Sequence, residues 1–155
     1  MSATPMTVGE ATAFFHARCA LNPRFAFDTL AGRWVLVMIP GPASAPGRAE
    51  ALAAIAALPP ACLDPARRVV VVLGTDPADE QAGRFRDGHA LRVLWDNDGR
   101  GLRALRAMEA DGTARPGWLL LDPSLRLFAS WPLERFSISL GHNRRRRSSW
   151  RTHRA

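Results

Sequence analysis

The chain contains two cysteines, Cys19 and Cys62, and their thiols are its strongest nucleophiles. A thiol becomes reactive where a nearby cation or a helix N-terminus stabilises the thiolate. The two form neither a C-x-x-C pair nor a zinc-binding pattern, and His16 three residues before Cys19 supplies half of a metal site at most. We interpret both as free thiols, with Cys62 as the fallback redox thiol.

The stretch from Pro40 to Gly47 is the second candidate for a reactive site. The apolar run WVLVMI leads into the turn PGPASAPG, and an alanine-rich helix is expected from there to about Leu58. Ser44 is placed to cap that helix, with Pro46 in its first turn. A helix N-terminus after a buried strand stabilises thiolates and other anions, yet this stretch contains no cysteine.

This corner resembles the active site of the thioredoxin-like peroxiredoxins, the alkyl hydroperoxide reductase and thiol-specific antioxidant group. In that family the turn reads Pro-x-x-x-Thr/Ser-x-x-Cys. Pro40 and Ser44 match the pattern, and Gly47 stands in the slot of the peroxidatic cysteine. The resemblance implies a peroxide pocket built from Ser44 and an arginine, for which Arg115 is a distant stand-in. Because the cysteine is missing, it implies a degenerate pocket without a nucleophile.

A second segment, Arg115-Pro116-Gly117-Trp118, carries the same resemblance. Thioredoxin-like proteins place a cis-proline at this point, facing the active-site turn, and Pro116 fits that slot. The resemblance extends from Val8 to Leu133. It implies an α/β fold, a thioredoxin-like three-layer sandwich in which a central mixed sheet has helices on both faces and a C-terminal β-hairpin closes the sheet. We expect the family's last helix to be missing.

The order of elements favours the same fold class, because strands and helices alternate before the closing hairpin. We expect strands at 25–30, 33–39, 68–75, 91–95, 118–122 and 125–131. A helix should begin at Asp76, with Pro77 in its first position, and continue so that Ala78, Ala82 and Phe85 share one face. Asp96–Gly101 should form a turn, and a further helix should follow it through Leu102, Leu105 and Met108.

The segment Gly99-Arg-Gly101-Leu-Arg-Ala104 matches the dinucleotide-binding pattern G-x-G-x-x-A, with Asp122 about 20 residues further on. The two acids Asp96 and Asp98 before the first glycine would repel a pyrophosphate. We therefore favour a capped turn over a nucleotide site, and we expect neither a cofactor nor a metal.

Positive charge is concentrated at the C-terminal end. The net charge is +7, but residues 137–155 contain six arginines and no acid, and the rest of the chain is close to neutral. We interpret 1–136 as the folded domain and 137–155 as a disordered Arg-rich tail, expected to arise from a frameshift or truncation. Nucleic-acid binding through this tail stays open as an alternative.

The residues support two further functional hypotheses. The first is a non-catalytic accessory or regulatory module, supported by Gly47 in place of the cysteine. The domain also resembles one that precedes an iron- and 2-oxoglutarate-dependent oxygenase in some bacterial proteins. Such an oxygenase domain, or another protein, would be the partner, and a homodimer stays open. The second is a thiol peroxidase that uses Cys62 or Cys19. No apolar run reaches the length of a membrane span and no secretion signal is visible, so we expect a cytoplasmic protein without a membrane partner.

Overall fold

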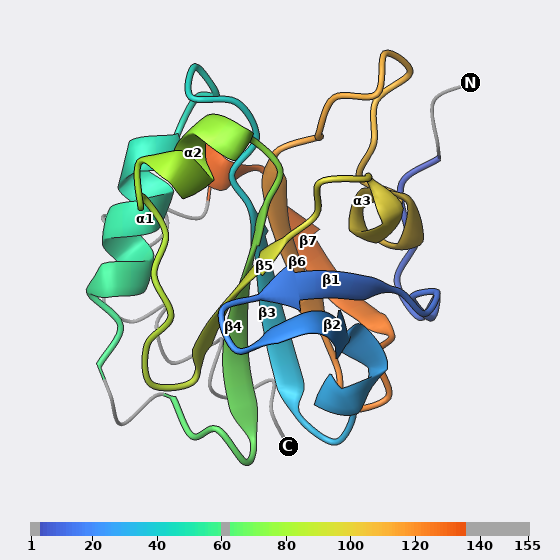
Figure 1. Ribbon diagram of the computed structural model, residues 1–155. Helices are drawn as coiled ribbons and strands as arrows, with labels where there is room; N and C mark the ends of the chain where they lie inside the picture. Colours follow the sequence, from blue (N-terminus) through green and yellow to red (C-terminus); the bar gives the residue numbers. More distant parts are fainter. Residues whose placement is uncertain (1–3, 60–62, 136–155) are drawn as a thin grey trace.

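The computed structural model describes residues 4–59 and 63–135, which form a mixed sheet of seven strands with short helices around it (Figure 1). The strands are β1 (His16–Cys19), β2 (Asn22–Ala26), β3 (Trp34–Ile39), β4 (Arg68–Gly74), β5 (Leu91–Trp95), β6 (Gly117–Leu121) and β7 (Leu127–Trp131). The helices are η1 (Phe27–Leu30), α1 (Arg48–Ala56), α2 (Pro77–Gln81) and α3 (Arg100–Ala104). Across these residues, no helix combines the length and the apolar character needed to span a bilayer.

The strands are ordered β2-β1-β5-β4-β3-β6-β7, with the most apolar ones in the centre. β3, β4 and β5 pair in parallel, as strands joined by helical crossovers do. Along β4, Val70 and Val72 pack on one face, while Val71 and Leu73 pack on the other, and all four are buried. Burial of both faces explains why this strand is a continuous apolar run.

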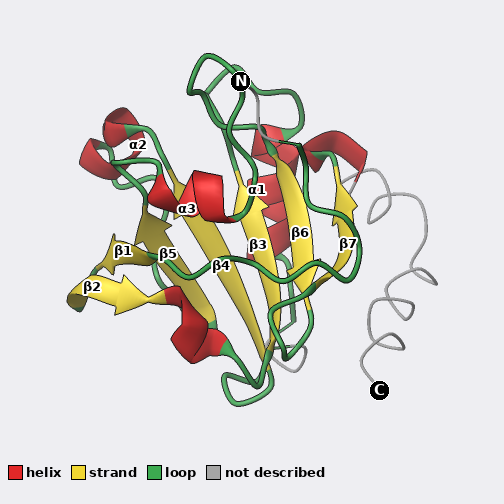
Figure 2. Ribbon diagram, turned by 90° about the vertical axis from the view of Figure 1, so that its right-hand side faces the viewer, coloured by secondary structure: helices red, strands yellow, loops and turns green. Residues whose placement is uncertain are grey.

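Two separate cores lie on the two faces of the sheet. In Figure 1 the helices α1 and α2 lie on one side of the strands and α3 on the other, and Figure 2 shows α3 in front of the sheet with α1 behind it. Ile55 of α1 packs with Met38 and Trp118 on the first face, and Leu102 of α3 packs with Phe27 on the second. The antiparallel hairpins β1–β2 and β6–β7 complete the sheet. The expected α/β class with a mixed sheet is confirmed.

The helices α2 and α3 are shorter than the sequence suggests, and both end in the same way. After α2, Gly83 is left-handed (φ 63°), its N–H bonds to the carbonyl of Glu80, and the N–H of Arg84 bonds to that of Asp79. This is the Schellman arrangement that terminates helices. Arg106 (φ 53°) occupies the equivalent position after α3. Phe85 therefore lies beyond α2, and the expectation that it shares a helix face with Ala78 and Ala82 is wrong.

One expected strand is also wrong in part. The segment 25–30 contains only the end of β2, and the chain then turns into η1. Phe27 and Leu30 are both buried on the same side, because residues three apart eclipse one another in a 3₁₀ helix. Alternating hydrophobicity had suggested an extended strand there. The other expected strands are present to within two residues at each end.

Residues 133–135 are helical and are the last residues described. The expectation of a missing last helix and the interpretation of residues 137–155 therefore lie outside the described residues. The same holds for Cys62.

Candidate functional site

The candidate site is the corner at the carboxyl end of β3, where the chain turns through Pro40–Gly47 into α1. In open α/β sheets this edge is where ligands and reactive groups gather. Asp76, which follows β4, belongs to the same edge because β3 and β4 are parallel. Its carboxylate accepts a hydrogen bond from the N–H of Ala78 (2.9 Å), so the expected cap of α2 is confirmed.

Gly47 forms the N-cap of α1 in a left-handed conformation (φ 81°), and no side chain caps the helix. The prediction that Ser44 caps it is wrong: Ser44 is exposed in the preceding turn, and the helix begins at Arg48, four residues after Ser44. A Cβ atom on Gly47 would lie 2.6 Å from the backbone nitrogen of Glu134 and 2.7 Å from its Cα. The direction in which a side chain at position 47 would start is therefore filled by backbone.

Pro116 lies directly against this turn, as the sequence suggested. A Cβ atom on Gly41 (φ 66°) would come within 2.6 Å of Pro116 Cγ, so the two residues are in close contact. The peptide bond is a different matter, because the described residues contain no cis peptide bond. Pro116 thus occupies the expected place in the trans form, and the cis expectation is wrong.

Arg115, the proposed stand-in for a peroxide-binding arginine, is bound to a neighbouring loop. Its guanidinium donates to Glu109 Oε1 (3.2 Å) and to the carbonyl of Arg106 (3.0 Å). An anion at the corner would have to compete with the Glu109 carboxylate for this cation. The Arg115 side chain therefore stabilises the segment between α3 and β6 through these hydrogen bonds.

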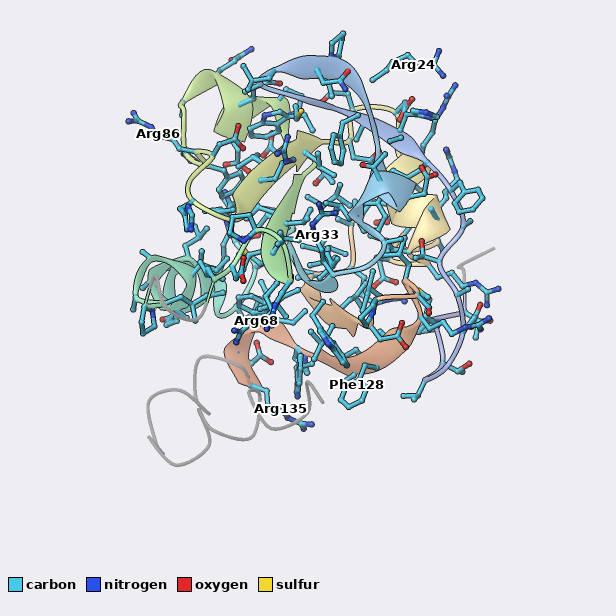
Figure 3. All side chains as sticks on the ribbon, turned by 90° about the horizontal axis from the view of Figure 1, so that it is seen from below. Arg24, Arg33, Arg68, Arg86, Phe128 and Arg135 are labelled. Carbon is cyan, nitrogen blue, oxygen red and sulfur yellow. The ribbon has the colours of Figure 1, made fainter. Side chains whose placement is uncertain are left out.

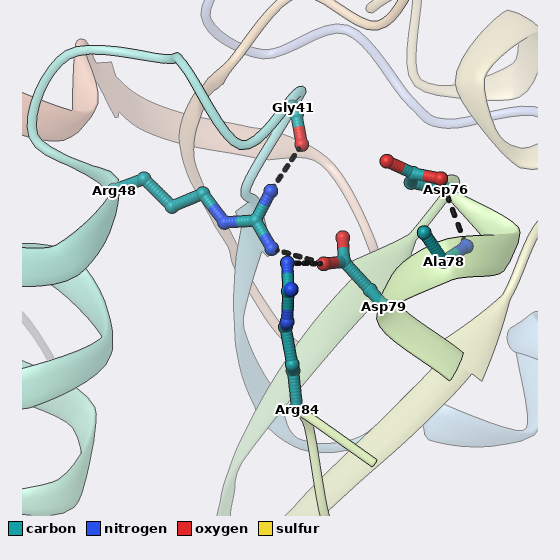
Figure 4. Close-up of polar contacts among 6 residues, drawn as sticks. All are labelled: Gly41, Arg48, Asp76, Ala78, Asp79 and Arg84. Carbon is teal, nitrogen blue, oxygen red and sulfur yellow. Dashed lines mark hydrogen bonds and ion pairs between the residues drawn. The ribbon is translucent and has the colours of Figure 1, made fainter. Parts of the chain in front are cut away.

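Arg48 is the charged residue at the corner that the motif comparison overlooked. It is buried at the first position of α1, where its Nη1 donates to the carbonyl of Gly41 (3.0 Å) and its Nη2 donates to Asp79 Oδ1 (2.5 Å) (Figure 4). Its guanidinium also lies 5.3 Å from the centre of the Phe85 ring, within the range of a cation–π contact. Its burial could have been predicted from helical spacing, because residues 48, 51 and 55 follow the i, i+3, i+7 stripe that faces the core.

Asp79 connects α2 to this arrangement. Its side chain is fully buried, and Oδ1 also accepts a hydrogen bond from Arg84 Nη1 (3.1 Å), so two cations meet one carboxylate oxygen (Figure 4). Among residues 4–59 and 63–135, Asp79 Oδ2 is the buried side-chain atom that lacks a hydrogen-bond partner. The cluster of Arg48, Asp79 and Arg84 contains no nucleophile, and its hydrogen bonds fix the turn at Gly41 relative to α1 and α2.

Cys19 lies away from this corner, because β5 and β4 separate its strand from β3. Its side chain is buried in the core on the α3 side, with Arg92 Nη1 at 3.9 Å from the sulfur. His16 on the same strand is exposed while Cys19 is buried, so the two do not form half of a metal site. Within the described part of the chain, no three His, Cys, Asp or Glu side chains gather as metal ligands.

The glycine pattern at residues 99–104 forms the turn into α3. Asp96 is buried, and its carboxylate accepts hydrogen bonds from the N–H groups of Gly101 (2.8 Å) and Leu102 (2.9 Å). Those are the donors that a pyrophosphate would need, so the capped-turn interpretation is supported over the nucleotide site. Burial raises the pKa of Asp96 above its ordinary value, and the two backbone hydrogen bonds oppose the rise.

Comparison with known proteins places the fold among the peroxiredoxins. The chain superposes on the bacterioferritin comigratory protein of Xanthomonas campestris, for which alkyl peroxide reduction is described, with a TM-score of 0.64 and 18% identity over 93% of this chain and 100% of that one. AhpC of Mycobacterium tuberculosis superposes with a TM-score of 0.65 and 15% identity, over 95% of this chain and 99% of that one. A cysteine-to-serine mutant of PrxQ from Xylella fastidiosa superposes with a TM-score of 0.64 and 12% identity, over 89% of this chain and 97% of that one. No protein-family model and no curated protein sequence matches the chain. The likeness shows a peroxiredoxin-like thioredoxin fold.

Proposed function

We propose that this chain is a degenerate peroxiredoxin-like domain that acts as a non-catalytic accessory or regulatory module. The observation that supports this best is at Gly47, where the residue is a left-handed glycine and the backbone of Glu134 lies within 2.6 Å of the position of a Cβ. Peroxide reduction by this fold needs a thiolate at the start of the helix. This corner contains no cysteine and has no room for a side chain at that position.

The remaining residues of the corner support a structural role for it. Arg48, which follows the cysteine slot, is tied to Gly41 and Asp79, and a buried ion pair of this kind holds α1, α2 and the turn in one arrangement. An accessory module needs a stable, defined surface and no reactive group. A downstream iron- and 2-oxoglutarate-dependent oxygenase domain, or another protein, is the partner that we propose for that surface, and a homodimer is the alternative.

The alternative is a thiol-dependent peroxidase that uses another cysteine. Cys19 is disfavoured by its burial in the core at 5% exposure, since a peroxide must reach the sulfur to be attacked. Cys62 lies outside the described residues, so it has to be tested by mutation. Peroxidase activity of the wild type that disappears in Cys62→Ser would replace the proposed function with this alternative.

The test is consumption of hydrogen peroxide and cumene hydroperoxide with dithiothreitol or thioredoxin as reductant, with an active peroxiredoxin as positive control. We expect the wild type and Cys62→Ser to consume no peroxide above the buffer rate. Gly47→Cys should also remain inactive, because a side chain at position 47 meets the Glu134 backbone. Full activity of Gly47→Cys would show that the corner tolerates the cysteine and would remove the main support for the proposal.

Nucleic-acid binding through residues 137–155 is a separate alternative, suggested by six arginines without an acid. We expect weak, salt-sensitive and non-specific binding at most. If binding to RNA or DNA survives deletion of residues 137–155, the tail is not responsible for it.

A further inference from the structure

A pocket lies on the α1 side of the sheet, away from the cysteine slot. Its volume is about 360 Å³. Val70, Val72 and Val93 of the central strands form its floor, and Leu52 and Ile55 of α1 form one wall. This volume lies at the lower end of the range found for small-molecule sites.

The early end of α2 explains why the pocket exists. Because Gly83 terminates α2, residues 82–90 cross this face of the sheet without forming a helix. From this segment Phe85 reaches inward: it is buried, lines the pocket and stacks on Trp95 with ring centres 5.8 Å apart.

The polar groups at the pocket are all positive or neutral. Arg84, Arg86 and His89 are among the described lining residues, and none of those residues is an acid. Arg84 is shared with Asp79, whereas Arg86 and His89 have no ion-pair partner within residues 4–59 and 63–135. Arg86 extends outward from the segment between α2 and β5 (Figure 3), and its flexible side chain can turn toward the carboxylate of a ligand. An apolar interior beside the unpaired guanidinium of Arg86 is complementary to an amphipathic anion.

We propose that this pocket binds a medium-chain fatty carboxylate, with its alkyl chain against the valines of the sheet and its carboxylate beside Arg86 and His89. Decanoate serves as the probe of this class, because its alkyl chain and carboxylate match the apolar interior and the positive rim of the pocket. The inference does not depend on the proposed function, because the pocket would be present whether or not a cysteine reacts with peroxide.

The binding experiment uses decanoate with the full chain and follows isoleucine methyl groups by NMR. Ile55 lines the pocket, whereas Ile39 is buried in the core on the opposite face and serves as an internal control. We expect a saturable shift of the Ile55 methyl signal with one site per chain, and no change at Ile39. Decyltrimethylammonium, with the same chain and the opposite charge, should bind at least about fivefold more weakly.

Two pairs of variants locate the site. Ala53 and Ala56 are both exposed on α1, but only Ala56 lines the pocket. Ala56→Trp should abolish decanoate binding by filling the mouth, and Ala53→Trp should leave it unchanged. Arg86→Gln combined with His89→Gln should weaken decanoate about threefold to fivefold and leave decanol unaffected. Circular dichroism on each variant checks that it is folded.

Any of three results would overturn the proposal: no saturable Ile55 shift with decanoate, equal loss of binding in Ala53→Trp and Ala56→Trp, or binding of the cationic probe as tight as that of decanoate. None of these results changes what the peroxide assay measures, so this proposal and the proposed function can fail independently.

Discussion

Arg48 Nη2 and Asp79 Oδ1 are 2.5 Å apart, and both side chains are almost completely buried. The pair joins the first residue of α1 to α2, so it links the turn after β3 with the segment after β4. Removing ions from water is costly, and a buried pair is maintained only where its geometry and its further hydrogen bonds compensate for that cost. Gly41, Arg84 and Phe85 provide those further contacts.

Replacing Arg48 with Met should destabilise the protein strongly, because it leaves the buried Asp79 carboxylate with one cation instead of two. We expect a loss of about 3 kcal/mol in the free energy of unfolding, at the low end for broken buried pairs because Arg84 still reaches Asp79. Urea denaturation followed by circular dichroism measures it.

The matched control is Arg67→Met. Arg67 pairs with Asp64 at 3.9 Å, but its side chain is 81% exposed, so we expect a change below about 0.5 kcal/mol. If the two variants lose the same stability, burial of the Arg48–Asp79 pair is not what matters.

Gly47→Ala should also destabilise the protein, for two reasons that can be separated. The left-handed backbone costs about 1–2 kcal/mol for any residue with a Cβ, and overlap with the Glu134 backbone adds about 1–3 kcal/mol. Gly83→Ala is the control, because Gly83 is also left-handed (φ 63°) but has no atom within 4 Å of its Cβ position. Thermal and urea unfolding should show the larger loss for Gly47→Ala. Equal losses would mean that Glu134 moves aside, and the cysteine slot would then be open.

Much of the fold could be predicted from local sequence. The central strands appear as β-branched apolar runs because both of their faces are buried, and Asp76-Pro77 marks the start of α2 through well-understood capping chemistry. The end of α2 could have been predicted as well, since Gly83 is the residue that Schellman caps favour. The early end of α3 was harder to see, because Arg106 adopts the left-handed conformation there without being glycine.

The candidate site was less predictable, because its decisive contacts join residues far apart in the chain. The resemblance to peroxiredoxins suggested Gly47 as the position of the cysteine, from its spacing after Pro40. The approach of Glu134, from the far end of the described chain, depends on how the end of the sheet folds back. In the same way, helical periodicity placed Arg48 on the core side, but its pairing with Asp79 requires α1 and α2 to pack at one edge.

Asp96 should titrate at a higher pH than a typical aspartate, since burial raises its pKa from the ordinary 3.8. Between 3.8 and its raised folded-state pKa, the folded protein binds more protons at this site than the unfolded protein does. The contribution of Asp96 to stability therefore falls as pH rises through that window and is constant above it.

Carbon-detected NMR of the side-chain carboxyl groups measures this directly. Asp111 is the internal reference, because hydrogen bonds from the hydroxyl and N–H of Thr113 lower its pKa. We expect the midpoint of Asp96 above that of Asp111, and Asp96→Asn should remove the corresponding slope from the dependence of stability on pH. A midpoint for Asp96 at or below that of Asp111 would contradict the prediction.

Cys19 should react slowly with Ellman's reagent in the folded protein, because its sulfur is buried against the core on the α3 side. In a Cys62→Ser background, where Cys19 is the single thiol, we expect modification at least about 100-fold slower than in denaturant, since β1 must open first.

The control introduces Leu21→Cys into a chain that lacks both natural cysteines. Leu21 is 92% exposed in the same hairpin, two residues after Cys19, so this thiol should react at the rate of an unfolded peptide. If Cys19 reacts as fast as the control thiol, its burial does not protect it. Cys19 would then return as a candidate for the peroxidase alternative, and Cys19→Ser in the peroxide assay would decide the question.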